Sequence, residues 1–205
     1  MHNKADFGYP VRIIDTPGFG DSQLRDSEFF PMIREQLIDL IQQPLDQGGG
    51  IHCIFLVYKM TSSIDAIFTS LNIFHELIQP FTGVWENVVL VFTHAEPSTL
   101  HYHQQYKMKL KTKVSLQIKE KYQLTKALPM VFLSTQTYTC SYLKGLGECD
   151  CERGHRYHAD CRRRLYEQVK IRSTRPFHLD DCEYPPSSLS PTMEMSTIQE
   201  SSLME

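Results

Sequence analysis

The chain has 205 residues, a formal net charge of −3 and a hydrophobic fraction of 41 %. This length is typical of one domain that buries a core, and the negative charge argues against general nucleic-acid binding. No apolar run approaches the roughly 18 residues of a membrane span, and the first residues lack the apolar core of a signal peptide. The six cysteines then predict reduced thiols in a cytoplasmic protein.

The first informative stretch is residues 11–21, which read VRIIDTPGFGD. Val11, Ile13 and Ile14 predict a buried parallel strand, and Pro17 with Gly18 predicts a turn directly after it. Asp15 would then lie at the carboxyl end of a strand, where open α/β sheets bind ligands. A carboxylate there can hold Mg²⁺, and the amide of Gly18 can approach a phosphate oxygen. The alternative is an ordinary corner between a strand and a helix.

Apolar strands and amphipathic helices alternate along the rest of the chain. The expected elements are helix 26–43, strand 51–58, a helix that starts at 61–63 and ends near Pro80, strand 88–92, a polar helix at about 98–122, strand 130–134 and a last helix at about 159–172. Four buried strands in this order predict an open, mainly parallel α/β sheet with flanking helices.

The expected domain covers residues 1–172. Residues 173–205 are rich in proline, serine and acids and predict a disordered tail. Several lysines of the polar helix lie two positions apart, so they do not share one helix face. They predict a solvated surface, with an acidic partner or an anionic membrane surface as the alternative.

The residues Thr93-His94-Ala95-Glu96 follow strand 88–92 directly. Together with residues 11–21 and the strand–helix–strand of residues 51–92, they make the chain resemble the AIG1-type G domain of the septin-like, TRAFAC-class GTPases. The resemblance starts at the family's third strand and implies a partial P-loop NTPase fold. It also implies a protein that binds GTP or GDP with Mg²⁺ and forms homo- or hetero-oligomers through its G domain.

By this resemblance, Asp15 corresponds to the Mg²⁺-linked acid of switch II and Gly18 to the contact with the γ-phosphate. Thr16 and Pro17 lie between them in the same turn and would line the nucleotide. Phe19 stands where Ras-like enzymes carry the glutamine that orients water, so we expect weak or no GTP hydrolysis.

Residues 93–96 sit where G domains read the base and resemble the Thr-His-Ala variant of the chloroplast-import GTPases. The carboxylate of Glu96 can accept two hydrogen bonds from the guanine edge, and His94 can flank the ring. Thr93 begins the motif, and Ser134 loosely matches the last guanine-lining position. The alternative is that Glu96 caps a helix and His94 is an exposed loop residue.

The chain contains no G-x-x-x-x-G-K-[S/T] sequence, and only ten residues precede Val11. Hydrogen bonds to phosphate contribute about 1.5–3 kcal/mol each, so their loss predicts that this chain alone binds GTP weakly. A truncated gene model is the simplest explanation, and a degenerate relative is the second. Without the family's first strand, the strands at 11 and 51 either pair directly or leave two open sheet edges. The competing function is a nucleotide-independent interaction module that retains the G-domain shell.

Five potential zinc ligands lie within thirteen residues: Cys149, Cys151, His155, His158 and Cys161. They are enough for one tetrahedral Zn²⁺, and His158 and Cys161 can share a helix face. Their spacing matches no zinc-ribbon or zinc-finger pattern, and the alternative is a polar loop with incidental cysteines.

Overall fold

Three parallel strands form an open sheet in the order β1-β2-β3. The computed structural model describes residues 11–18, 26–96, 101–135, 152–178 and 180. The strands are β1 (Ile54–Lys59), β2 (Val88–Thr93) and β3 (Met130–Phe132). They confirm three of the four predicted strands, and the protein is a mixed α/β structure with helices flanking a parallel sheet.

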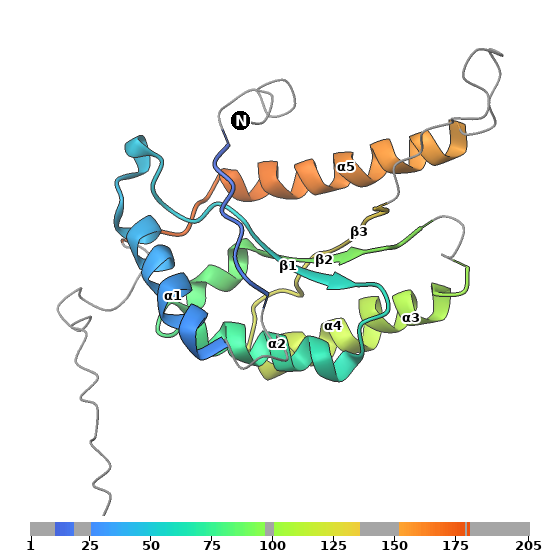
Figure 1. Ribbon diagram of the computed structural model, residues 1–205, viewed down its shortest axis with the longest axis horizontal. Helices are drawn as coiled ribbons and strands as arrows, with labels where there is room; N and C mark the ends of the chain where they lie inside the picture. The colour runs from blue at the N-terminus through green and yellow to red at the C-terminus, as the bar shows by residue number, and fades with distance from the viewer. Residues whose placement is uncertain (1–10, 19–25, 97–100, 136–151, 179, 181–205) are drawn as a thin grey trace, which may run out of the picture.

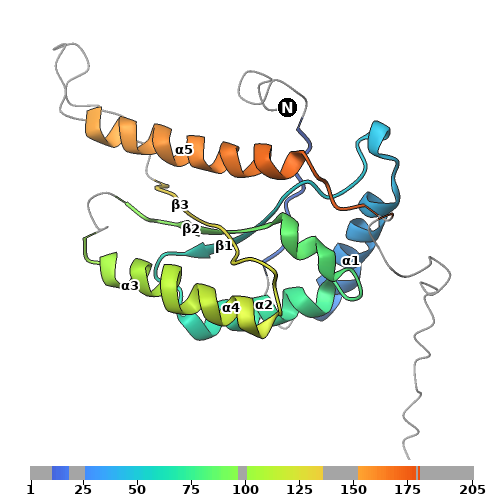
Figure 2. The same cartoon turned by 180° about the vertical axis from the view of Figure 1, so that it is seen from behind.

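Helices cover both faces of this sheet (Figure 1). Helix α5 lies along one face, and the other helices lie along the opposite face, as the reverse view also shows (Figure 2). The helices are α1 (Asp26–Gln42), α2 (Ile64–Leu77), α3 (Gln104–Lys109), α4 (Ser115–Lys121) and α5 (Glu152–Ser173), with a π-helical turn, Leu110–Val114, joining α3 to α4. No helix in the described ranges has both the length and the apolar character to cross a bilayer.

The side chains of β2 alternate between two cores. Val88, Leu90 and Phe92 pack into the larger core with α1, α2 and α4, and Val89 and Val91 pack into a smaller core that includes Leu165 of α5. All five of these β2 residues are buried. This is the environment that a continuous apolar run predicts for the middle strand of a parallel sheet.

Local signals in the sequence set several element ends. The side chain of Ser63 accepts a hydrogen bond from the amide of Ala66 at 3.1 Å and caps α2, as predicted. After α1, the glycine run turns the chain sharply toward β1. Gly50 has a φ of +81°, and a Cβ on Gly49 would lie 1.8 Å from the carbonyl oxygen of Gln43. Only glycine therefore fits this close approach of backbone to backbone.

The predicted strand at residues 11–14 is wrong. Residues 11–18 form an irregular segment, and Ile13 is 69 % exposed. A strand needs a neighbour to take its backbone hydrogen bonds, and within the described residues no strand pairs with the outer edge of β1. Of the two expected arrangements, the structure has the one with open sheet edges.

The ordered chain also extends further than predicted after α5. This helix begins at Glu152 rather than near residue 159, and it ends at Ser173. Phe177 is buried and forms an antiparallel bridge with Ile51. The buried Asn87 amide holds this segment by donating to the carbonyls of His52 and Arg175 at 3.0 and 3.1 Å. The expected tail therefore starts too early at residue 173, and residues 181–205 lie outside the described residues.

Candidate functional site

The candidate site lies at the carboxyl ends of β2 and β3, which point to the same edge of the sheet because the strands are parallel. Beyond the paired strands, the amide of Ala95 donates to the carbonyl of Leu133 at 2.9 Å. This bond holds the two loops together. It brings the next residues, Glu96 and Ser134, to the same place although they are 38 positions apart.

The buried carboxylate of Glu96 is the centre of this arrangement. Its Oε1 accepts hydrogen bonds from the amide of Thr135 at 2.8 Å and from the hydroxyl of Thr135 at 3.1 Å. Its Oε2 accepts a hydrogen bond from the hydroxyl of Ser134. An ionised carboxylate is stabilised by several donors of this kind, so the bonds fix the orientation of Glu96.

Two residues of helix α5 contact these loops. The ring Nε2 of His158 lies 3.2 Å from the hydroxyl oxygen of Ser134. The preceding residue of the same helix also reaches this edge, since the hydroxyl of Tyr157 donates to the carbonyl of Ala95 at 2.8 Å. Burial raises the pKa of Tyr157 to about 12, so this hydroxyl remains a donor at physiological pH. We refer to Glu96, Ser134, Thr135 and His158 as the Glu96 cluster.

His94 lies at the exposed rim of the same edge. Its φ of 59° places it in the left-handed region, which is uncommon for residues other than glycine. The ring Nδ1 lies 3.0 Å from the hydroxyl of Thr93, and that hydroxyl donates to the carbonyl of Tyr58 at 3.2 Å. His94 is thus an accessible ring held beside the ends of β1 and β2.

The residues predicted to contact Mg²⁺ and phosphate lie on the surface and outside any helix or strand. Asp15, Thr16 and Gly18 are exposed, and Pro17 is partly buried. Because residues 11–14 form no strand, Asp15 does not stand at the carboxyl end of a strand as predicted. Thus Glu96 and Ser134, two of the residues predicted to read the base, meet at the carboxyl ends of β2 and β3, whereas residues 15–18 lie in an irregular surface segment.

Comparison with protein-family models, with curated proteins and with solved structures finds no match to this chain.

The predicted zinc ligands fall mostly outside the described residues. Cys149, Cys151 and the side chain of His155 lie outside the described part of the chain. Cys161 is buried, and its thiol donates to the carbonyl of Phe132 at 3.4 Å, a contact that ties α5 to β3. No three histidine, cysteine or acidic side chains among those described gather in a way that could hold a metal.

Two members of the Glu96 cluster, Thr135 and His158, were not predicted from the sequence to lie at this site. Thr135 supplies two of the bonds to Glu96, and the hydroxyl pair directly after a strand was a signal that could have found it. The contact of His158 with Ser134 carried no such signal, because it depends on where α5 docks.

Proposed function

We propose that the protein binds a guanine nucleotide through a partial G domain similar to the AIG1 type. The base would lie at the carboxyl ends of β2 and β3, beside His94 and Glu96. The phosphates would lie against residues 15–18. We propose no hydrolytic role, since Phe19 offers no group that positions water.

The contact between Glu96 and Ser134 carries this proposal. Both residues match base-lining positions by sequence resemblance, although they are far apart in the chain. They meet at the carboxyl ends of parallel strands, which is where open α/β sheets bind ligands, and this supports the proposal. The exposed ring of His94, next to the same edge, adds a flat surface that can flank a purine.

Asp15 is the residue we assign to Mg²⁺. Mg²⁺ is commonly held by one or two carboxylates, with phosphate oxygens and water completing its shell. One exposed carboxylate fits that donor set only together with the nucleotide phosphates. We therefore expect Asp15 to hold Mg²⁺ in the nucleotide-bound protein and not by itself.

Titration with fluorescent GTP and GDP tests the proposal. We expect saturable binding that weakens in Asp15→Ala and in Glu96→Gln. Glutamine keeps a carbonyl for the amide of Thr135, and its amide can donate to the hydroxyl of Ser134, so the fold is retained. It removes one of the two acceptors that the guanine edge needs. Binding that is absent at high micromolar protein, or unchanged in both variants, contradicts the proposal.

A second candidate is an interaction module that does not bind nucleotide. The specific observation is the outer strand β1, which has no neighbour on one edge within the described part of the chain, and on which Val57 is 59 % exposed and Phe55 is 36 % exposed. Neighbouring apolar side chains on an open edge strand are typical of a surface that pairs with another chain. Sedimentation of the protein with and without GTP separates the candidates. Self-association that is independent of nucleotide and lost in Val57→Lys favours the interaction module.

A further inference from the structure

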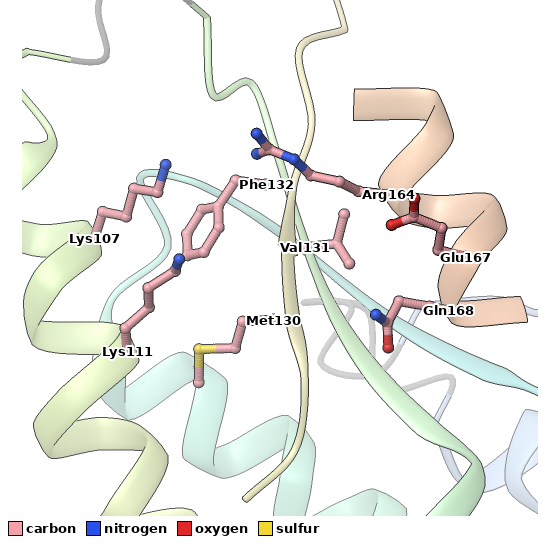
Figure 3. A pocket seen from close by; sticks show the side chains of 8 residues that line it. All are labelled: Lys107, Lys111, Met130, Val131, Phe132, Arg164, Glu167 and Gln168. Carbon is pink, nitrogen blue, oxygen red and sulfur yellow. The ribbon is translucent and has the colours of Figure 1, made fainter. Parts of the chain in front are cut away.

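A cavity of about 320 Å³ lies beside β3, between the segment of α3 and the π-helical turn on one side and α5 on the other. Its floor is formed by β3, with Met130, Val131 and Phe132. Its walls carry Lys107 and Lys111 on one side and Arg164, Glu167 and Gln168 on the other, as Figure 3 shows. The volume is within the range of small-ligand sites.

Two cationic groups of this cavity face one aromatic ring, and a third extends toward them from α5 (Figure 3). The ammonium groups of Lys107 and Lys111 lie 4.8 and 5.5 Å from the centroid of Phe132. The charge of Arg164 is near enough to lower the pKa of Lys107. The cation–π contacts favour lysine conformations in which both ammonium groups face the ring.

The cavity has too little negative charge to balance these groups. Among the described residues, Glu167 is the only acid that lines it, and its Oε1 accepts a hydrogen bond from Arg163 outside the cavity at 3.2 Å. Burial lowers the pKa of Lys107, and the nearby charges of Lys111 and Arg164 lower it further. These like charges repel one another, and an anion between them would relieve that repulsion.

We propose that this cavity, the β3-edge cavity, is a binding site for a compact polyanion with adjacent phosphate groups. Arg164 offers a planar fork that matches two phosphate oxygens, and the two lysines add point charges. The gathering of three cations in a small space suits a di- or triphosphate better than a single carboxylate. A free polyphosphate and a phosphorylated lipid headgroup present this same chemistry.

The first experiment titrates the full chain with inorganic tripolyphosphate by calorimetry. We expect binding that weakens roughly tenfold or more in Lys107→Gln and in Lys111→Gln, since each loses a charge-assisted hydrogen bond. Lys109→Gln and Lys113→Gln are matched controls, because both lysines are exposed on the same helical segment and neither lines the cavity. Equal weakening in the controls, or no binding, overturns the proposal.

A second readout locates the ligand without any variant. Acetylation of lysines, followed by mass spectrometry, should show protection of Lys107 and Lys111 by tripolyphosphate and none of Lys109 and Lys113. The same binding in Asp15→Ala separates this cavity from the proposed nucleotide site. Protection that is uniform along the helix, or tripolyphosphate binding lost in Asp15→Ala, overturns it.

Vesicles that contain phosphatidylinositol 4,5-bisphosphate distinguish the two sources of phosphate. Co-sedimentation that depends on Lys107 and Lys111 supports the site and assigns it to a lipid headgroup. Tripolyphosphate binding without co-sedimentation supports the site and assigns it to a free polyphosphate. If polyglutamate displaces tripolyphosphate and binds at least as tightly in a way that depends on Lys107 and Lys111, the cavity is a surface for acidic peptides and the proposal fails.

Discussion

Truncation of Glu96 to alanine tests whether the Glu96 cluster holds the end of the sheet together. The substitution removes the acceptor of three hydrogen bonds, from the hydroxyl of Ser134 and from the amide and hydroxyl of Thr135. The three hydrogen bonds are partly buried, so each lost bond costs about 1–1.5 kcal/mol. We therefore expect Glu96→Ala to lower the free energy of unfolding by about 3–4 kcal/mol, a large share of the stability of a small domain.

Urea unfolding followed by tryptophan fluorescence measures this loss. Trp85 is the single tryptophan of the chain, and it is 4 % exposed and stacked on Tyr122 with ring centroids 5.0 Å apart. Unfolding exposes this indole to water, so its emission reports the transition. The midpoint should fall while the urea dependence stays the same.

Two substitutions control the interpretation. Glu96→Gln retains an acceptor for Thr135 and should cost only about 1 kcal/mol. Asp15→Ala removes an exposed side chain and should change stability by less than about 0.5 kcal/mol. A loss below about 1 kcal/mol in Glu96→Ala would refute the reasoning, because the carboxylate would then not be a buried acceptor in solution.

Three further predictions concern the fold. Gly49→Ala should destabilise the protein by about 2 kcal/mol or more in urea unfolding, because its Cβ would meet the carbonyl of Gln43 and the backbone must move; an unchanged midpoint contradicts this. Asn87→Leu should cost about 2–3 kcal/mol and speed proteolysis after α5, since two carbonyls lose their donor; equal proteolysis argues against it. Burial raises the pKa of Cys53 from 9.0 to about 11, so the folded state keeps a proton that the unfolded state loses, and stability should fall as pH rises from 9 to 11. Cys53→Ala should remove that part of the fall, and an unchanged pH profile in this variant refutes the assignment.

Much of the fold could be predicted because local physics determines it. The unbroken apolar run of residues 88–92 predicted a strand covered on both faces, and β2 is that strand because parallel neighbours and helices leave it no solvated face. The start of α2 followed from the hydroxyl of Ser63, which satisfies a free amide of the first turn. The places of residues 93–96 and of Ser134 at the ends of β2 and β3 followed from where the apolar runs stop, and their role in reading a base stays a prediction.

The failures have one cause, which is that a strand or a site depends on partners remote in sequence. Val11, Ile13 and Ile14 are β-branched apolar residues that suit a strand, but no described strand offers them hydrogen bonds, and they remain irregular and exposed. Phe177 was assigned to a tail from composition, although Ile51 provides a bridge and a buried place for its ring. Lys107 and Lys111 are four positions apart and share a helix face, yet only the docking of α5 brings Arg164 to the same cavity.

The sequence by itself determined the strands and helices whose apolar spacing and end signals are complete within a few residues. Tertiary structure alone decided which strands found neighbours, how Glu96 meets Ser134 and Thr135, and which cations line the cavity beside β3. The physical reason is that backbone pairing and side-chain convergence require two segments at once, and a linear pattern describes only one of them.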